Sequence, residues 1–515
     1  MKPEELGFWN WAQRDPDRTA LIVPGPRKTS FGELFAESNR VAYALRAMDL
    51  RPGDALAVIM PNCIEFYEIY LAALQTGLYF TPINHYLATP EVAYVLSDCE
   101  AKAFFVHSQF ATTAKEAVEQ IDYRRSACFS VGGGPFEAYE DVKARRPATL
   151  PADRRAGISM IYTSGTTGYP KGVRAPLPDE PPEGPTATRV MSGALIGWQP
   201  GNDVYLLNGP LHHSAPISFS TIALHLGHAV VLTDKWDAET TLRLIEENRV
   251  INTQMVPIHF HRLLKLPEDV RRKYDVSSIK TILHSAAPCP VATKKAIIDW
   301  FGPVVFEYYG GTEGGATMVT SQEWLDRPGT VGRPWPGTEL KIFDDDGKEL
   351  PPGEVGAIYF KTMLGPPNYF KDARKSEAVR RGEYFTLGDV GYVDPDGWLY
   401  LVDRKADMLV SGGVNIYPAE IEAVLLQHPA VTDVAVFGVP NVEWGEEVKA
   451  VIETATENPD DMLRANILAF CEGKLARYKI PRSIEFSRDL PRAPNGKLYK
   501  RQIRERYWKG RDERI

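Results

Sequence analysis

Residues 160–173, MIYTSGTTGYPKGV, have the composition of a loop that binds a polyanion. Glycines let the backbone turn tightly and approach an anion, while hydroxyls and a lysine ammonium bind phosphate oxygens. Loops of this kind form anion-binding concavities. The pattern is not a Walker A loop, because the lysine is followed by Gly172 and not by Ser or Thr. The candidate phosphate-binding residues are Thr163, Ser164, Gly165, Thr166, Thr167, Gly168 and Lys171.

A second glycine-rich segment, EYYGGTEGG at 307–315, combines aromatic, hydroxyl and carboxylate side chains. An aromatic ring can stack on a purine, and Thr312 could contact a phosphate oxygen. Glu313 could ligate Mg²⁺, which prefers carboxylate oxygens and keeps phosphates and waters as its other ligands. The segment does not fit GxGxxG, so it does not indicate a Rossmann dinucleotide site.

Two later segments carry further candidates. Asp389 follows a glycine in the block 384–422 and could bind both hydroxyls of a ribose, and Arg404 could donate to the same sugar. The segment LPRAPNGKLYKRQIR at 490–504 contains an NG pair, which marks a tight turn and would present Lys497 at a loop tip.

The elements expected to position these residues alternate between strands and helices. In the first 150 residues we predict helices at 31–48 and 61–74 and buried strands at 55–60 and 103–106. Such alternation favours parallel sheets covered by helices on both faces. The proline-rich acidic stretch 174–189 predicts an exposed loop.

The pattern changes near residue 340. Two DG turns predict hairpins, and a helix, a strand and another helix follow, as in a small α+β unit. We place a domain boundary in the charged stretch Asp403–Asp407, where few contacts need to cross. The predicted domains are residues 1–404 and 405–515.

Composition excludes several protein classes. The chain is 44% hydrophobic and 24% charged, as in a folded globular protein. Its net charge of −8 disfavours nucleic acid as a partner. Five scattered cysteines without a CxxC pair predict neither a disulfide framework nor a zinc site. No signal-peptide core and no apolar run of 18 residues occurs, so we expect a cytoplasmic protein without a membrane span.

Together, the four segments resemble the adenylate-forming superfamily of acyl-CoA synthetases, peptide-synthetase adenylation domains and luciferases. The resemblance covers essentially the whole chain, with the motifs in the family's order. It implies an α/β fold with a large N-terminal domain of two sheets plus a distorted barrel and a small mobile α+β C-terminal domain. The active site would lie between them. It also implies activation of a carboxylic acid by ATP and Mg²⁺ to an acyl-adenylate, with pyrophosphate release, and then transfer to CoA.

The resemblance also assigns the adenylation residues. The loop from Thr163 to Lys171 would bind the β- and γ-phosphates, Thr312 the α-phosphate and Glu313 the Mg²⁺. Lys497 would bridge the acid's carboxylate and the α-phosphate, where attack of one anion on another needs positive charge. The residues implied at adenosine are Ser285, Ala286, Ala287, Pro288, Tyr308, Tyr309 and Gly310, with Tyr309 stacked on adenine, and Asp389 and Arg404 at the ribose.

For the second step the resemblance implies rotation of the small domain. The hinge position is Ala406, where the family usually has Asp or Lys, so this chain lacks a charged hinge contact. The pantetheine channel would be lined by Ser411, Gly412 and Gly413, and His213 would lie near the acyl carbonyl. The implied acyl pocket consists of His212, His213, Pro257, Gly310, Gly311 and Met318, whose two glycines suggest room for an aryl or medium-chain acid.

Two other functions remain as alternatives. An amide synthetase would pass the acyl group to an amine or amino acid with the same adenylation residues. A non-catalytic nucleotide sensor on this fold is disfavoured, because it would have no physical reason to keep Lys497 on an exposed loop. The sequence leaves the identity of the acid open, and likewise the choice between a monomer and a homodimer.

Overall fold

A computed structural model describes residues 6–163, 170–363, 365–404, 407–411, 414–492, 496 and 498–508. The chain divides into two compact units, each made of separate stretches of sequence. Unit 1 consists of Met1–Met255, Leu266–Leu283 and Pro367–Ala378, and unit 2 of Val256–Lys265, His284–Pro366 and Val379–Ile515. The predicted boundary at 404 and 405 stays a prediction.

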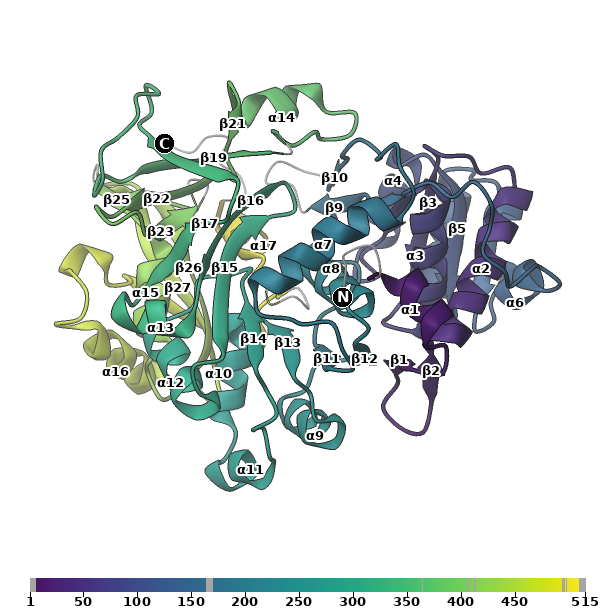
Figure 1. Cartoon of the computed structure of the whole chain (residues 1–515). Helices are drawn as coiled ribbons and strands as arrows, with labels where there is room; N and C mark the ends of the chain where they lie inside the picture. Colours follow the sequence, from purple (N-terminus) through teal and green to yellow (C-terminus); the bar gives the residue numbers. More distant parts are fainter. Residues whose placement is uncertain are drawn as a thin grey trace. The chain divides into compact units, whose positions relative to one another are not determined.

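Unit 1 contains a parallel six-stranded sheet whose order is β7-β6-β5-β3-β4-β8. Helices flank its strands (Figure 1), and α2 begins at a capping box in which Ser30 and Glu33 satisfy each other's backbone amides. The strands are β3 (Ala55–Ile59), β4 (Tyr79–Pro82), β5 (Ala101–His107), β6 (Cys128–Val131), β7 (Glu137–Ala138) and β8 (Ile158–Ser159). The helices are α2 (Phe31–Ala47), α3 (Ile64–Thr76), α4 (Thr89–Asp98), α5 (Ala111–Gln120) and α6 (Tyr139–Lys143). The predicted alternation of strands and helices is confirmed.

A second run of strands in unit 1 has the order β2-β1-β12-β11-β13, parallel except for β2. Its strands are β1 (Thr19–Ile22), β2 (Lys28–Ser30), β11 (Val204–Leu207), β12 (Ala229–Leu232) and β13 (Asn252–Met255). The helices of this part of the chain are α1 (Phe8–Arg14), α7 (Glu183–Leu195), α8 (Ser214–His225), α9 (Ala238–Asn248) and α11 (Glu268–Lys273). A separate hairpin joins β9 (Ile161–Thr163) and β10 (Lys171–Val173), and α14 spans Ala373–Ala378.

The predicted loop at 174–189 is only partly correct, because α7 begins at Glu183. Proline is tolerated in the first turn of a helix, where backbone amides have no intrahelical partner. An acidic residue is favourable there as well. Thr186 is buried and its hydroxyl donates to Pro182 O, which anchors this first turn.

Unit 2 contains an antiparallel run of strands, β15-β16-β17-β23-β22-β19-β21-β20, with β18 paired to β19. Both predicted DG hairpins are confirmed, as β18–β19 and β22–β23. The strands are β15 (Val305–Gly311), β16 (Gly314–Val319), β17 (Thr330–Pro334), β18 (Thr338–Phe343), β19 (Gly356–Thr362), β20 (Arg380–Arg381), β21 (Tyr384–Phe385), β22 (Asp389–Val393) and β23 (Leu399–Arg404). The helices are α10 (Pro257–Lys265), α12 (Val291–Phe301) and α13 (Ser321–Asp326), and β14 (Thr281–His284) ends where this unit begins.

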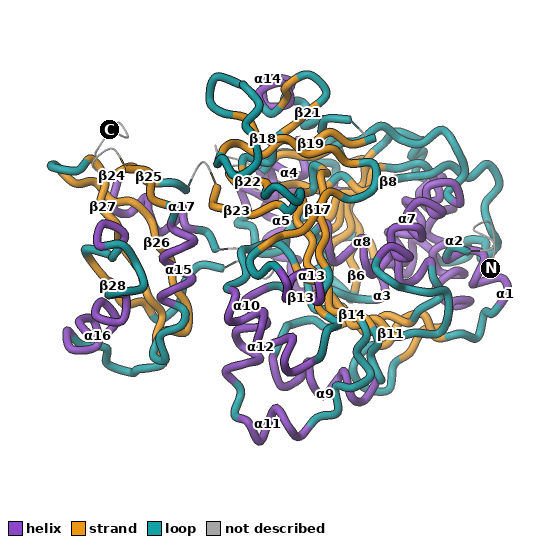
Figure 2. The backbone as a smooth tube through the Cα atoms, turned by 60° about the vertical axis from the view of Figure 1, so that its left-hand side comes forward, coloured by secondary structure: helices purple, strands orange, loops and turns teal. Residues whose placement is uncertain are grey.

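The C-terminal part of unit 2 forms its own sheet, β25-β24-β27-β26, with β28 parallel to β27. Figure 2 shows these strands together with α15, α16 and α17. Their apolar faces share one core that includes Ile421, Val436, Ile452 and Ile467. The elements are β24 (Leu409–Ser411), β25 (Val414–Ile416), α15 (Pro418–Leu425), β26 (Val431–Asn441), β27 (Gly445–Thr454), α16 (Asp461–Cys471), β28 (Ser483–Ser487) and α17 (Lys500–Trp508). The predicted small α+β unit is confirmed.

Two sequence expectations concern the chain as a whole. None of the helices in the described ranges is long and apolar enough to cross a membrane. All five cysteines are free. The part of the chain that the structure describes contains no group of three or more His, Cys, Asp or Glu side chains that could hold a metal ion.

Candidate active site

The β15–β16 hairpin of unit 2 presents Thr312 and Glu313 side by side at its two-residue turn. Gly311 and Gly314 pair across the base of the turn. Gly314 has a φ of 109°, a conformation that glycine adopts without steric cost. The predicted α-phosphate and Mg²⁺ residues are therefore neighbours at a hairpin tip.

Glu313 fits a Mg²⁺ site as a single protein ligand. Mg²⁺ is commonly bound by one or two carboxylates, with substrate phosphates and waters completing its octahedron. A carboxylate beside a proposed phosphate site has that chemistry.

The residues predicted at adenine and ribose are connected in unit 2. The hydroxyl of Tyr309 donates a 2.7 Å hydrogen bond to Oδ2 of Asp389. Asp389, on β22, lies directly opposite Arg404 on β23. The side chain of Arg404 lies outside the described residues. Asp389 is itself buried, so its carboxylate belongs to a built polar site and not to the solvated surface.

The predicted adenine wall, residues 285–288, follows the end of β14. Ala286 has a φ of 77°, which is rare for a residue with a Cβ and marks backbone strain. Burial raises the pKa of Tyr308 to about 12, although the Ser285 hydroxyl that bonds it opposes the shift. Tyr308 thus links β15 to the wall segment as a neutral phenol.

One of the two glycines of the predicted acyl pocket has a backbone explanation. A Cβ at Gly310 would lie 2.2 Å from Gly315 O, and one at Gly311 would lie 2.9 Å from Oε2 of Glu313. The backbone of the hairpin therefore requires glycine at Gly310, so this glycine does not by itself indicate a bulky acid, whereas only side-chain ends lie close to Gly311. Met318 faces Tyr308 across the same hairpin, and Pro257 is the first residue of α10.

In unit 1 the ends of the predicted phosphate loop are joined by the β9–β10 hairpin. Thr163 and Lys171 are direct partners across this antiparallel pair. Residues 164–169, which include the predicted Ser164, Gly165, Thr166, Thr167 and Gly168, lie outside the described residues.

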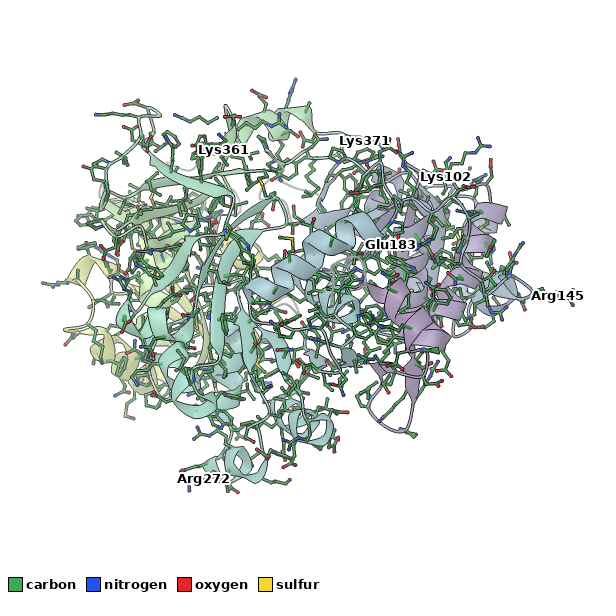
Figure 3. The ribbon with its side chains drawn as sticks, in the orientation of Figure 1. Lys102, Arg145, Glu183, Arg272, Lys361 and Lys371 are labelled. Atoms are coloured by element: carbon green, nitrogen blue, oxygen red, sulfur yellow. The ribbon has the colours of Figure 1, made fainter. Side chains whose placement is uncertain are left out.

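Lys171 contacts an acidic residue that the sequence analysis missed. Its Nζ lies 3.2 Å from Oδ2 of Asp372, and this interaction raises the pKa of the lysine. The neighbouring Lys371, which is labelled in Figure 3, donates to Asp98 O and pairs with Glu100 at 2.9 Å, which ties this segment to the end of α4. Asp372 is thus fixed close to the foot of the predicted phosphate loop.

The two adjacent histidines differ in environment. His213 is the N-cap residue of α8. His212 is buried, and neither of its ring nitrogens has a hydrogen-bond partner among the described residues. Burial, together with the neighbouring rings of His213 and His85, lowers the pKa of His212 far below its ordinary value, so its ring is neutral. His85 packs edge-on against it, with ring centroids 4.8 Å apart.

Lys497 itself lies outside the described residues, but the loop that carries it is anchored. Arg492 forms a β-bridge with Leu498 and donates from Nη1 to Gly496 O at 2.6 Å. The same guanidinium donates from Nη2 to Oδ1 of Asp433 at 2.6 Å. Arg492 therefore holds both ends of the predicted catalytic loop.

The predicted CoA-step residues are described only in part. Ser411 ends β24 and is paired with Val414 and with Gly445. Gly412, Gly413 and the predicted hinge Ala406 lie outside the described residues. Their roles, like those of all the site residues, stay predictions.

Sequence reasoning missed three sets of charged contacts beside the predicted site. Each contact joins residues that are far apart in the sequence, so no local sequence pattern predicts it. One of the residues, Arg492, lies in the segment 490–504 that the sequence analysis singled out, and could have been considered there. The contacts are Lys171 with Asp372, Arg492 with Asp433, and Lys294 with Glu307 and His284.

Comparison with known proteins agrees with these features. The profile of the AMP-binding enzyme family matches residues 8–369, and that of the AMP-binding enzyme C-terminal domain matches residues 420–497. A long-chain-fatty-acid–CoA ligase of Mycobacterium tuberculosis is 32% identical over 511 residues, covering 97% of this chain and 98% of that protein.

Two solved structures are similar over nearly their whole length. The anthranilate CoA ligase AuaEII in complex with anthranoyl-AMP has a TM-score of 0.85 at 27% identity, covering 98% of this chain and 99% of its own. An amide bond synthetase from Marinactinospora thermotolerans has a TM-score of 0.82 at 25% identity, and the match covers 97% of this chain and 99% of that protein's chain. The fold is therefore the mixed α/β fold of these proteins, with a large N-terminal part of several sheets and a small C-terminal domain.

Proposed function

The chain belongs to the AMP-binding enzymes, which activate acids as adenylates, and from this premise we propose that it is an acyl-CoA synthetase. It converts a carboxylic acid and ATP into an acyl-adenylate and pyrophosphate. It then transfers the acyl group to CoA, which gives a thioester and AMP.

The observation that carries the proposal is the arrangement at the β15–β16 hairpin. Tyr309 is hydrogen-bonded to Asp389, and Thr312 and Glu313 follow at the turn of the same hairpin. The hairpin thus offers an aromatic ring, a phosphate donor and a Mg²⁺ ligand, and the bond to Asp389 on β22 adds a ribose acceptor beside the ring. A protein without nucleotide chemistry would have no reason to combine them.

In the first step an oxygen of the acid's carboxylate attacks the α-phosphorus of ATP. The bond to the bridging oxygen breaks, and pyrophosphate leaves with the electron pair. No general base is required, because a carboxylic acid is already ionised at neutral pH. Lys497 stabilises the negative charge that the two anions share, and Thr312 donates to the α-phosphate. Mg²⁺ at Glu313 would neutralise phosphate charge.

In the second step the sulfur of CoA attacks the acyl carbonyl carbon, the bond to the AMP oxygen breaks, and the thiol proton leaves to water. His213 is the polar residue that we propose near this carbonyl. Its position as the N-cap of α8 places it beside backbone amides that favour developing negative charge. Ser411 is proposed at the pantetheine channel.

We propose an aryl or fatty acid as the substrate. The similar proteins include a long-chain-fatty-acid–CoA ligase, an indoleacetate–CoA ligase and the anthranilate CoA ligase.

The second candidate is amide synthesis, because one of the similar structures is an amide bond synthetase. Mass spectrometry of the products decides between them. The protein would be incubated with Mg-ATP and a panel of aliphatic and aryl acids, each with CoA, with an amino acid, or with neither. AMP with acyl-CoA supports the proposal, and AMP with amide but no thioester supports the second candidate. Failure of every acid to give AMP would contradict both.

A further inference from the structure

Lys294, Glu307 and His284 form a buried charged cluster in unit 2. Nζ of Lys294 donates a 2.6 Å hydrogen bond to Oε2 of Glu307, and Nε2 of His284 lies 3.4 Å from the same oxygen. The side chains of Lys294 and His284 are 0% exposed. An ammonium removed so fully from water is retained only where a carboxylate compensates it.

The three residues join three elements. His284 is the last residue of β14, Lys294 lies in the first turns of α12, and Glu307 lies in β15. The proposed adenine wall, residues 285–288, runs between the first two. Tyr308 and Tyr309 directly follow the third. The cluster therefore holds together the backbone segments from which both sides of the proposed adenine site extend.

Neighbouring contacts hold the charged cluster and β15 in place. Lys294 Nζ lies 4.7 Å from the ring centroid of Trp324 on α13, a favourable cation–π arrangement. Ser321, at the start of that helix, bonds both the amide and the carbonyl of Val305 in β15. The ring of Phe260 packs edge-on against His284 at 5.2 Å.

Backbone strain in the wall segment 285–288 explains why the charged cluster is needed to support it. Ala286, with its φ of 77°, would relax unless the surrounding structure held it. Two anchors lie at the start of the wall: His284, which precedes it and lies 3.4 Å from Glu307, and the hydrogen bond between Ser285 and Tyr308. Tyr308 directly follows Glu307, so both anchors depend on the charged cluster.

We propose that Lys294 is a positioning residue for adenine, acting through Glu307 on Tyr308, Tyr309 and the wall segment 285–288. The inference rests on the proposed function, because it presumes that adenosine binds there. It assigns Lys294 no contact with substrate. Lys294 affects the binding of adenine and not the binding of the phosphates.

The protonation states agree with the proposal. Burial alone would raise the pKa of Glu307, but the cluster of His284 and Lys294 outweighs it, and the pKa lies below its ordinary value. Burial lowers the pKa of His284, and Glu307 opposes this shift. Burial and Glu307 also raise the pKa of the Cys289 thiol, and Lys294 opposes this shift.

The test measures binding of AMP and of inorganic tripolyphosphate by isothermal titration calorimetry, so no acid needs to be known. The variant Lys294→Met removes the charge and keeps most of the side chain's volume. We expect AMP to bind about tenfold more weakly and tripolyphosphate, which lacks the base, to bind as in the wild type. The control Lys295→Met changes the next residue of α12, an exposed lysine paired with Asp299, and should change neither.

A pH profile separates positioning from a general loss of stability. In Lys294→Met the uncompensated Glu307 takes up a proton near neutral pH, so the loss of AMP affinity should grow from pH 6 to pH 8 as this carboxyl ionises. The double variant Lys294→Met/Glu307→Gln has no buried charge. It should recover most of the affinity and show a flat profile.

Three results would overturn the inference. The first is that Lys294→Met binds AMP as tightly as the wild type does. The second is that its affinities for AMP and for tripolyphosphate fall by the same factor. The third is that the double variant binds AMP no better than the single variant does. If Lys294→Met does not fold, Glu307→Gln replaces it, and unchanged AMP binding by that variant would overturn the inference. A wild-type protein that binds neither AMP nor ATP would overturn the proposed function as well.

Discussion

The hydroxyl of Tyr309 lies 2.7 Å from Oδ2 of Asp389 and donates a hydrogen bond to it, although the two residues are 80 positions apart. The bond joins the tip of β15 to the start of β22. It fixes the tyrosine ring with respect to the carboxylate. If the ring stacks on adenine, the carboxylate then lies where the sugar of the same nucleoside must be.

This relationship predicts unequal effects for two substitutions. Tyr309→Phe keeps the ring and loses the hydrogen bond, so ATP should bind about fivefold more weakly, as expected for about 1 kcal/mol. Asp389→Ala removes the proposed ribose acceptor, and ATP should bind about a hundredfold more weakly. Calorimetry with ATP and 2′,3′-dideoxy-ATP checks the cause. The wild type and Tyr309→Phe should prefer ATP, whereas Asp389→Ala should not distinguish the two nucleotides.

A second prediction concerns Lys171 and Asp372, which lie 3.2 Å apart and are both partly exposed. An ion pair in contact with water is worth at most about 1 kcal/mol, so Asp372 cannot hold the lysine away from a triphosphate. Asp372→Asn should therefore change ATP affinity less than about fivefold. Lys171→Ala should weaken the binding of ATP about tenfold or more. It should leave the binding of AMP unchanged, because AMP lacks the β- and γ-phosphates. Equal loss of ATP and AMP would show that Lys171 supports the fold of the loop instead.

The elements of this fold were predictable where a local signal exists. The hairpin β18–β19 follows from a DG turn between alternating apolar residues, and α2 follows from a capping box and an apolar face at helical spacing. The start of α7 was missed because proline and acidic residues, typical of loops, are equally suited to the first turn of a helix.

The geometry of the candidate site was less predictable. The pairing of Asp389 with Arg404 depends on a shift in register between Val390 and Gly391, which no sequence pattern shows. The pair of Lys294 and Glu307 joins a helix to a strand, and burial of a lysine goes against its usual exposure. Motifs therefore identified the residue types of the site, while tertiary contacts decide how those residues are held.

A third prediction separates the two half-reactions. Lys497→Ala should abolish adenylate formation, measured as exchange of labelled pyrophosphate into ATP, while a supplied acyl-adenylate still reacts with CoA. Arg492→Met should show the same pattern more weakly, because Arg492 bonds Gly496 O and so positions the loop. Equal loss of both half-reactions would contradict the proposed role of Lys497.

The control for Arg492→Met is Arg501→Met. Arg501 is an exposed arginine on α17, paired with Glu505 at 2.6 Å. It carries the same charge in the same part of the chain and pairs within its own helix. Arg501→Met should leave both half-reactions unchanged, and a loss equal to that of Arg492→Met would mean that net charge is responsible.

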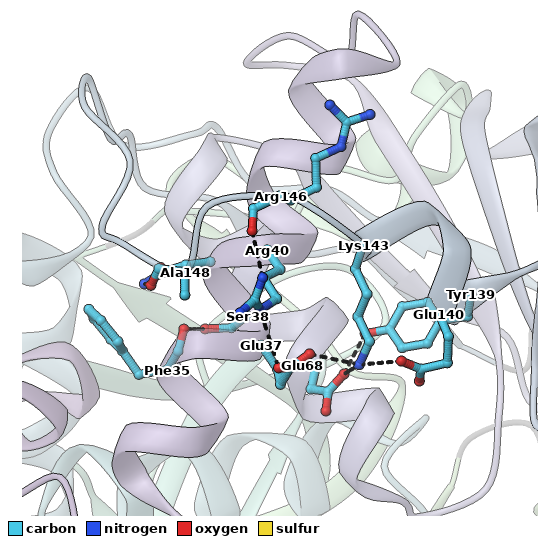
Figure 4. A network of polar contacts seen from close by, with 11 residues as sticks. Phe35, Glu37, Ser38, Arg40, Glu68, Tyr139, Glu140, Lys143, Arg146 and Ala148 are labelled. Atoms are coloured by element: carbon cyan, nitrogen blue, oxygen red, sulfur yellow. Dashed lines mark hydrogen bonds and ion pairs between the residues drawn. The ribbon is translucent and has the colours of Figure 1, made fainter.

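The last prediction concerns stability and its pH dependence, at a buried lysine of unit 1. Lys143 on α6 contacts three carboxylates, Glu37, Glu68 and Glu140, with Nζ to oxygen distances of 2.9, 3.0 and 3.2 Å (Figure 4). Tyr139 also donates to Glu68, at 2.6 Å. Glu68 is buried, and burial raises its pKa above 4.5 although Lys143 opposes the shift.

Lys143→Met should lower the free energy of unfolding at pH 8 by about 3–5 kcal/mol, because it leaves Glu68 buried without a cation. A raised pKa in the folded state means that the folded protein favours the protonated carboxyl, so stability falls as pH rises through that pKa. The loss should therefore be smaller at pH 5, where Glu68 is partly protonated, than at pH 8. Urea denaturation at both pH values measures it, with Lys115→Met, at the exposed pair with Glu119, as the control expected to change by less than about 0.5 kcal/mol. An equal loss at pH 5 and pH 8 would mean that packing of the lysine stem, and not its charge, is what stabilises this part of unit 1.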